Sequence, residues 1–188
     1  MAMRIPHQEF LALHLEAHEL LKDVPLRDVS AVDLTGGGDG RTIADVLRLM
    51  EMSRKRPSTA VAILVGVRRF IGSVLHWDGD KSEPSYAHRL STDQRQRSLT
   101  PVGTASGPLS VLYEFPLEMV GEVQNATVHA FACMALSRRA AGYRLYWAVY
   151  VRNVSRFTPV YMAAIEPFRR WIVYPAILGE IRDGWRDL

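Results

Sequence analysis

Apolar residues recur at helical spacing close to the amino terminus, where residues 7–22 place most of their apolar side chains on one side. Pro25 ends this pattern, because the residue before a proline avoids the α conformation. Residues 28–34 then alternate between apolar and polar side chains and predict a strand. The chain is therefore expected to begin with one amphipathic helix and one strand.

The glycine-rich run of residues 35–40 predicts a tight turn between that strand and a second helix. Thr42 is a suitable N-cap for a helix over residues 43–52, and Asp45 places a negative charge in its first turn. A third helix is predicted after Pro57 and extends to about residue 76.

A polar segment, residues 77–108, separates these helices from the second half of the chain. The Asp-Gly-Asp sequence of residues 78–80 is a turn signal, and Ser91 can start a short helix that ends near Leu99. We expect this segment to form a mobile surface loop.

Strand patterns dominate the second half of the chain. Strands are predicted over residues 109–115, 117–124, 127–137 and 143–152. Residues 138–142 end in glycine and predict the turn of a hairpin. In the last strand the odd-numbered positions are apolar and the even-numbered ones include two arginines, so we expect one face on a core or cavity and the other partly in water.

The carboxyl-terminal segment, residues 157–183, is predicted to be one long helix. Pro167 and Pro175 each remove a backbone hydrogen bond and clash with the carbonyl group four residues earlier, so the helix should bend or break near one of them. Trp147 in the last strand and Trp171 in this helix both sit on apolar faces, and we expect both to be buried.

Length and composition limit the fold and the chemistry. The 188 residues are 48% hydrophobic and 23% charged, which is typical of one globular domain. The single cysteine, Cys133, excludes an internal disulfide and a zinc site built from cysteines. The formal charge is only +3, and no basic cluster is interleaved with aromatic residues, so no nucleic-acid binding is expected.

No membrane-spanning segment is expected either. The apolar region of residues 157–178 is long enough to span a bilayer, but Glu166, Arg169 and Arg170 lie in its middle, where charges are costly. The amino terminus has no uninterrupted apolar stretch of the secretory kind. We therefore expect a cytoplasmic protein.

No motif identifies a reaction. The glycine run lacks the lysine of a P-loop and the glycine spacing of a dinucleotide site, which favours a plain turn over an anion site. His14 and His18 have a spacing that can bind a metal, but no third ligand is evident. His129 is predicted in a strand, where either a neighbour satisfies it or it lines a cavity.

The carboxyl-terminal half resembles a known family. Residues 167–173 (Pro-Phe-Arg-Arg-Trp-Ile-Val) are similar to a Pro-Phe-(His or Arg)-Arg-x-Ile-Val core found in an uncharacterised bacterial family of domains of unknown function. Residues 67–72 and the strand at 28–34 also look similar. That family is sometimes attached to NAD(P)-binding epimerase-like domains, and it resembles the START-like, helix-grip group.

The resemblance implies an α+β fold in which a curled antiparallel sheet packs around a long bent carboxyl-terminal helix. Residues 1–188 would form a single domain, with residues 1–27 as an extra amino-terminal helical extension and residues 28–185 as the helix-grip core. The alternative is an α+β layer with a flat sheet and no cavity.

The helix-grip group binds lipids, sterols, polyketides and other apolar molecules, and some members are cyclases. The resemblance therefore implies a non-catalytic binding or carrier protein for a small apolar ligand, without cofactor or metal. The alternatives are a module that binds a partner or a membrane surface through the apolar carboxyl-terminal helix, and a cyclase- or aromatase-like enzyme. A homodimer is also compatible with the sequence.

Strand alternation and the implied enclosure together predict the lining of such a cavity. The expected residues are Tyr113, Met134 and Trp147 from the sheet, with Tyr161 and Ile165 from the helix. None of them is assigned a catalytic role, because the family motif is structural. The rival expectation is a solid core in which the same side chains interlock.

Overall fold

A computed structural model of the chain describes residues 3–55, 84–124, 128–154 and 158–188. The helix predicted after Pro57 and the turn predicted at residues 78–80 lie outside the described residues. No helix in the described part of the chain is long and apolar enough to cross a bilayer.

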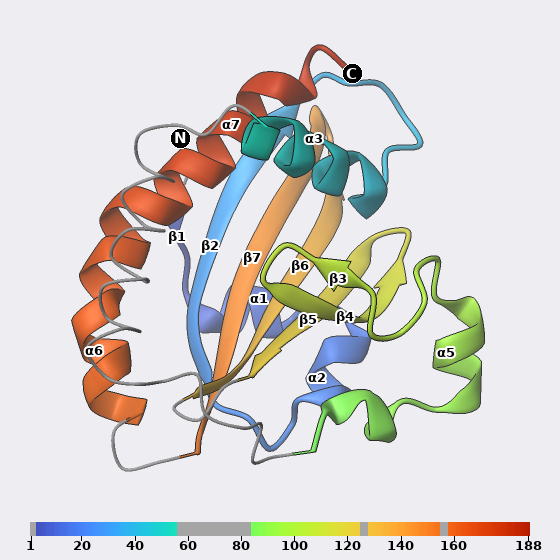
Figure 1. Cartoon of the computed structure of the whole chain (residues 1–188). Helices are drawn as coiled ribbons and strands as arrows, with labels where there is room; N and C mark the ends of the chain where they lie inside the picture. Colours follow the sequence, from blue (N-terminus) through green and yellow to red (C-terminus); the bar gives the residue numbers. More distant parts are fainter. Residues whose placement is uncertain (1–2, 56–83, 125–127, 155–157) are drawn as a thin grey trace.

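The described residues form a seven-stranded antiparallel sheet in the order β1-β2-β7-β6-β5-β4-β3, which curls without closing (Figure 1). Its strands are β1 (Met3–Arg4), β2 (Leu26–Thr35), β3 (Ala105–Ser106), β4 (Leu109–Phe115), β5 (Glu118–Gln124), β6 (Val128–Arg139) and β7 (Gly142–Asn153). The predicted α+β class and the predicted strands are confirmed.

The central pair of strands, β6 and β7, forms the predicted hairpin. Met134 pairs with Trp147, and the pairing continues without interruption to Gly142 at the turn. Gly142 has a positive φ of 136°, and a Cβ atom there would clash with the carbonyl oxygen of Leu34 on β2. Glycine is therefore required where the hairpin turn meets the neighbouring strand.

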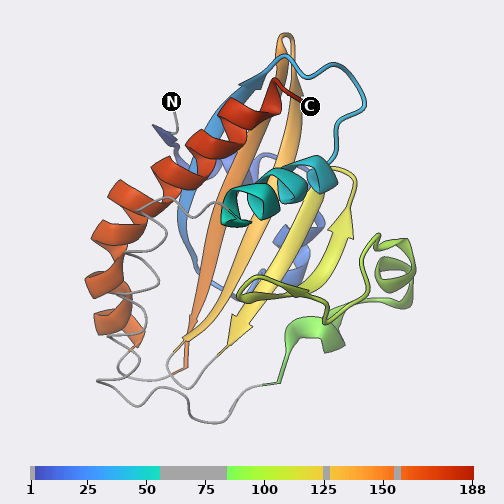
Figure 2. The same cartoon turned by 45° about the horizontal axis from the view of Figure 1, so that its top comes forward.

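Both faces of the sheet are covered (Figures 1 and 2). Helices α3 (Ile43–Lys55) and α7 (Tyr174–Trp185) pack on one face, which we call the C-helix face. Helices α1 (His7–Leu11) and α2 (Glu16–Leu20) and the 3-10 helix η1 (Tyr86–Arg89) cover the other, the N-helix face. The expectation that one face of β7 stays partly wet is largely wrong, because Tyr146, Ala148 and Tyr150 are buried there.

The single amino-terminal helix predicted over residues 7–22 is in fact two short helices, α1 and α2. The Glu118 carboxylate on β5 accepts the backbone N–H groups of Glu16 at 3.0 Å and Ala17 at 2.8 Å. These N–H groups belong to the first turn of α2, so a buried side chain of the sheet caps the second helix. That capping interaction is a tertiary contact that helical periodicity does not contain.

Two other helix starts agree with the sequence. The Asp45 carboxylate accepts the Thr42 backbone N–H at 3.0 Å at the start of α3. Ser91 and Gln94 form a capping box at the start of α5 (Thr92–Arg97). In both cases the capping residues are local, which explains why the sequence alone identifies them.

The glycine-rich run forms a plain turn against the end of α7. Gly37 has a φ of 79°, and a Cβ atom there would lie 2.7 Å from Nε1 of Trp185. The Trp185 indole N–H donates to the carbonyl oxygen of Gly36 at 3.3 Å. The turn is therefore shaped to receive a buried tryptophan.

The carboxyl-terminal helix is irregular between its two internal prolines, as predicted. Helix α6 (Thr158–Phe168) leads into a π-helical turn, η2 (Arg169–Val173), and then into α7. The Tyr174 N–H bonds to the carbonyl oxygen of Arg169, five residues back. Since Pro175 has no N–H, the widened turn accommodates the missing bond, and the helix curves along the sheet (Figure 2).

The predicted burial is confirmed for Trp147 and wrong for Trp171. Trp147 is 8% exposed, whereas Trp171 is 73% exposed. In a regular helix Trp171 would lie in line with Tyr174 and Leu178, which are buried. The π-turn uses more residues per turn, so it rotates Trp171 out of that stripe.

We predict that Trp185→Ala lowers the free energy of unfolding by about 3–5 kcal/mol, because a fully buried indole is removed. Trp171→Ala, in the same helical segment, should change it by less than about 0.5 kcal/mol. Urea unfolding followed by far-ultraviolet circular dichroism measures both. Equal losses for the two variants would contradict the described helix orientation.

Candidate functional site

A groove of about 330 Å³ lies between the β1–β2 edge of the sheet and the irregular part of the carboxyl-terminal helix. Its lining combines charged and aromatic side chains with apolar ones: Met3, Arg4, Asp28, Ser30, Glu166, Arg169, Arg170, Trp171, Tyr174 and Pro175. We call it the edge groove.

Strand alternation and the π-turn together build its walls. In β2, Asp28 and Ser30 have the same parity as Val32 and Leu34, which belong to the core of the C-helix face. Ser30 pairs with Trp147 on β7, so this wall continues into the sheet. The ring of Trp147 lies 6.3 Å from that of Tyr174, between sheet and helix.

A nearly buried ion pair joins the two walls. The Arg169 guanidinium donates to Oδ2 of Asp28, and these side chains are 14% and 15% exposed. Arg169 also donates to the Tyr174 hydroxyl, from Nε at 2.8 Å and from Nη2 at 2.6 Å. Removing one member of such a pair leaves a desolvated charge, which typically costs about 3–5 kcal/mol.

The pair sets the protonation of its members. Burial alone would lower the pKa of Arg169, but the contacts with Tyr174 and Asp28 outweigh it and the net shift is upward. Burial raises the pKa of the Tyr174 phenol. At neutral pH the groove therefore contains a guanidinium cation and an uncharged phenol.

Part of the hydrogen-bonding capacity of the pair is unused. Oδ1 of Asp28 is buried and has no hydrogen-bond partner among the described residues. The contact described for Nη1 of Arg169 is a weak one, to the sulfur of Met162 at 4.0 Å. A buried polar atom without a partner costs free energy, and a hydrogen-bond donor that reached Oδ1 would offset that cost.

An exposed tryptophan forms the outer rim. Trp171 is 73% exposed, and the guanidinium of Arg170 lies over its ring, 5.7 Å from the centroid. Deeper in, the indole Nε1 of Trp147 is buried without a partner among the described residues. The groove thus has Trp171 at its rim and Tyr174 in its wall, and Trp147 lies behind Tyr174.

The structure does not bring the five predicted cavity residues together. Met134 and Trp147 are cross-strand neighbours on the C-helix face, and Trp147 lies beside the edge groove. Ile165 packs against a separate small cluster that contains Val151. The backbone of Tyr161 is in α6, and its side chain lies outside the described residues.

Tyr113 lies on the opposite side of the sheet. A bulge between Val111 and Tyr113 shifts the register of β4, so that Val111 joins the C-helix face and Tyr113 the N-helix face. There the Tyr113 hydroxyl donates to Glu118 at 2.5 Å. Simple alternation along the strand misses this switch, because one inserted residue reverses the parity.

Sequence reasoning missed Asp28, Ser30 and Tyr174 as members of a site. Arg169 belongs to the Pro-Phe-Arg-Arg core already singled out, but its partner Asp28 is 141 positions away. The signal in the sequence was an arginine, Arg169, in a largely apolar terminal helix. The sequence does not indicate which carboxylate neutralises this arginine.

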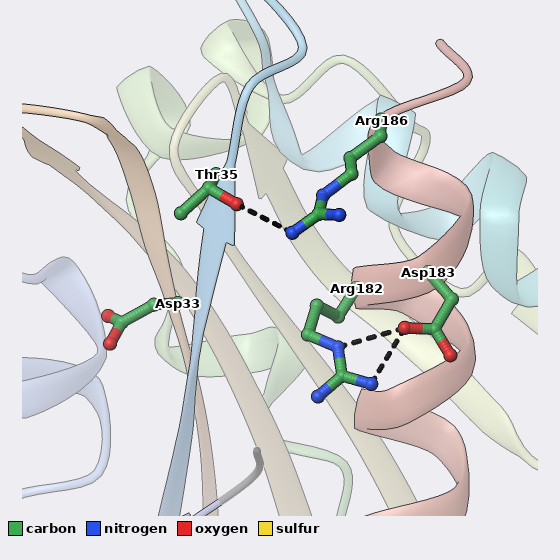
Figure 3. A pocket seen from close by; sticks show the side chains of 5 residues that line it. All are labelled: Asp33, Thr35, Arg182, Asp183 and Arg186. Carbon is green, nitrogen blue, oxygen red and sulfur yellow. Dashed lines mark hydrogen bonds and ion pairs between the residues drawn. The ribbon is translucent and has the colours of Figure 1, made fainter.

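A second hollow, of about 510 Å³, lies at the end of β2 beside α7 (Figure 3). Arg182 and Asp183 are ion-paired there at 2.7 Å, and Arg186 donates to the Thr35 hydroxyl at 3.3 Å. Asp33 points away from the arginines of α7 in Figure 3 and binds Arg144 at 2.6 Å. This hollow is polar and its charges already have partners, so it is the weaker candidate.

The buried polar groups of the N-helix face hold structure together. Nε2 of His129 and Oε1 of Glu122 are 2.5 Å apart. The same carboxylate accepts from the Ser85 hydroxyl at 2.5 Å and the Tyr86 N–H at 3.0 Å. Glu122 thus satisfies Nε2 of His129, as one of the two interpretations expects, whereas Nδ1 of the same ring is buried without a partner among the described residues.

The metal site considered for His14 and His18 finds no support. Among the described residues no group of three or more histidine, cysteine, aspartate or glutamate side chains could hold a metal ion. Nδ1 of His18 instead lies 3.3 Å from the Tyr150 hydroxyl, and its ring contacts that of Phe10 edge-on at 5.2 Å. His14 lies between the two short helices, so the presumed helical spacing is absent.

Comparison with protein families gives a match. The family model described as "Protein of unknown function (DUF2867)" matches residues 20–176, which is most of the chain. No curated protein and no solved structure matches the chain.

We predict that Glu122 makes stability sensitive to acid. Burial alone would raise its pKa, but hydrogen bonds from His129 and Ser85 lower it below the ordinary 4.5. A lowered folded pKa means that the unfolded chain takes up the proton first, so the stabilisation is present above pH 4.5 and lost as pH falls through the folded pKa.

The measurement is urea unfolding of the wild type and Glu122→Gln at a series of pH values. The advantage of the wild type should shrink below pH 4.5. Glu19→Gln, at an exposed position of α2, is the control and should show no such change. An advantage that grows as pH falls would contradict the sign of the shift.

Proposed function

The chain belongs to the DUF2867 family of proteins of unknown function, and we propose that it is a non-catalytic binding protein for a small, largely apolar ligand held in the edge groove. One observation carries the proposal: a hollow of ligand size lined by Trp171 and Tyr174 also includes Asp28, whose buried Oδ1 has no hydrogen-bond partner among the described residues. Small-molecule sites commonly combine an apolar lining with a few fixed polar groups.

The groove favours binding over catalysis. Its lining includes neither histidine nor cysteine, and its buried carboxylate, Asp28, is ion-paired to Arg169. Burial raises the pKa of the Cys133 thiol, and Cys133 lies on the N-helix face, away from the groove. The buried carboxylate of the lining is thus neutralised by a cation and has no histidine or cysteine beside it in the groove.

We also propose that the fold belongs to the START-like, helix-grip group. The curled antiparallel sheet and the long carboxyl-terminal helix along one face support this assignment. In such an arrangement, a ligand between sheet and helix contacts strand residues of one parity and one side of the helix. Asp28, Ser30 and Tyr174 meet that description in the edge groove.

A second candidate function is a surface for a partner or a membrane, favoured by the exposure of Trp171 and Phe168. Their side chains are 73% and 39% exposed on neighbouring turns of the terminal helix. Isolated exposed apolar residues are common, so this observation carries less weight than the groove.

We predict that the full-length protein binds the neutral apolar dye Nile red and that filling the groove abolishes the binding. Ser30→Leu adds bulk to a small, 8% exposed lining residue and should weaken binding at least about tenfold, which corresponds to roughly 1.4 kcal/mol. Thr35→Leu, on the same strand but lining the second hollow, is the matched control and should bind as the wild type does.

Dye fluorescence gives the dissociation constants, and native mass spectrometry of freshly purified protein detects any co-purified small molecule. Equal binding by the wild type and Ser30→Leu would overturn the proposal. Loss of binding on Trp171→Ala with full binding by Ser30→Leu would favour the surface around Trp171 instead.

A further inference from the structure

We infer that the edge groove selects an uncharged aromatic ligand that carries a hydroxyl group, and that it discriminates against the corresponding carboxylate. This inference rests on the proposed ligand-binding function of the groove. It adds the chemical class of the ligand, and three properties of the groove lead to it.

The first property is the charge balance of the buried pair. Asp28 and Arg169 carry opposite charges, and their side chains are only 15% and 14% exposed. A ligand carboxylate would bring a second negative charge beside Asp28 into a poorly solvated site. An uncharged head group avoids that repulsion and that desolvation cost.

The second property is the unused oxygen of Asp28. Two other buried carboxylates of the sheet have partners on both oxygens. Glu118 accepts from Glu16 on Oε2 and from Ala17 and Tyr113 on Oε1. Glu122 is paired through both of its oxygens as well.

Asp28 alone among these three has an oxygen, Oδ1, that is buried without a partner among the described residues. A carboxylate oxygen accepts a hydrogen bond, so the ligand atom that it fits is a donor, such as an O–H group. The same hydroxyl oxygen can accept from Nη1 of Arg169, whose described contact is only the weak one to Met162. A hydroxyl therefore matches both members of the pair, whereas a carboxylate has no proton to donate.

The third property is the shape of the remaining wall. Trp171, Tyr174, Pro175 and Met3 supply flat or apolar surface next to the pair. Aromatic rings pack well against a planar ligand body. The other charged lining residues, Arg4, Glu166 and Arg170, are exposed, so solvent and salt screen their effect on the head group.

Three probes with one shared body test the inference on the wild-type full chain: naphthalene, 2-naphthol and 2-naphthoate, each competed against Nile red at neutral pH. We expect 2-naphthol to bind at least about tenfold more tightly than 2-naphthoate, equivalent to roughly 1.4 kcal/mol. It should also bind more tightly than naphthalene, which lacks the hydroxyl group.

Changing the charge of the pair should reverse the preference. Asp28→Asn leaves the charge of Arg169 unbalanced, so this variant should bind 2-naphthoate more tightly than 2-naphthol. Asp33→Asn is the matched control, because Asp33 lies on the same strand and is also paired to an arginine, Arg144, but is exposed. It should keep the wild-type order. The charge-balanced double variant Asp28→Asn/Arg169→Gln should bind neither anion nor alcohol better than naphthalene.

The outcomes separate the two proposals. If Nile red and naphthalene bind but 2-naphthoate equals or exceeds 2-naphthol in the wild type, the ligand class is wrong and the binding function stands. If none of the probes binds, the groove is not a ligand site and both proposals fall. The order of affinities in the wild type tests the ligand class by itself, so the inference can be contradicted even if a variant fails to fold.

Discussion

The fold depends on the burial of the central hairpin on both of its faces. Strands β6 and β7 carry apolar residues at successive positions, so Leu145 and Trp147 need cover on one side while Tyr146 and Ala148 need it on the other. A sheet of this kind cannot leave one face in water. The amino-terminal helices and the segment around η1 cover one face, and α3 and the carboxyl-terminal helix cover the other. The remaining strands extend the sheet sideways, and the two edge strands are only two residues long.

Three carboxylates on the strands then fix the covering segments in place. Glu118 caps α2, Glu122 holds the segment that begins at Ser85, and Asp28 binds Arg169 of the terminal helix. Each joins parts of the chain that are far apart in sequence. Buried carboxylates are costly unless they are well paired, so their positions specify where each segment docks. Burial raises the pKa of Glu118 even though three hydrogen-bond donors contact its carboxylate.

The edge groove lies where one of these strand carboxylates, Asp28, contacts the irregular part of the carboxyl-terminal helix. Pro175 removes a hydrogen bond, the π-turn before it directs Arg169 and Tyr174 toward Asp28, and Trp171 is turned outward. π-turns are often found at functional sites because they alter which side chains a helix presents. Here the same distortion supplies both the polar wall and the aromatic rim of the hollow. The π-turn that accommodates Pro175 thus also positions the side chains on which the proposed binding depends.

The sequence pattern alone predicted the features that depend on residues close together in the chain. These features are the strands at 28–34, 109–115 and 143–152, the hairpin turn at Gly142, and the helix starts at Thr42 and Ser91. Pattern also anticipated the irregularity between the two prolines of the terminal helix. It could not reveal the split of the amino-terminal helix, the reversal of parity at Tyr113 or the exposure of Trp171, since a distant carboxylate, a bulge and a widened turn decide them.

The candidate site also depends on the tertiary structure. Trp147 and Arg169 were recognisable as unusual residues, but only the folded chain brings Asp28 to Arg169 across 141 positions, because hydrogen-bond partners are chosen by proximity in space.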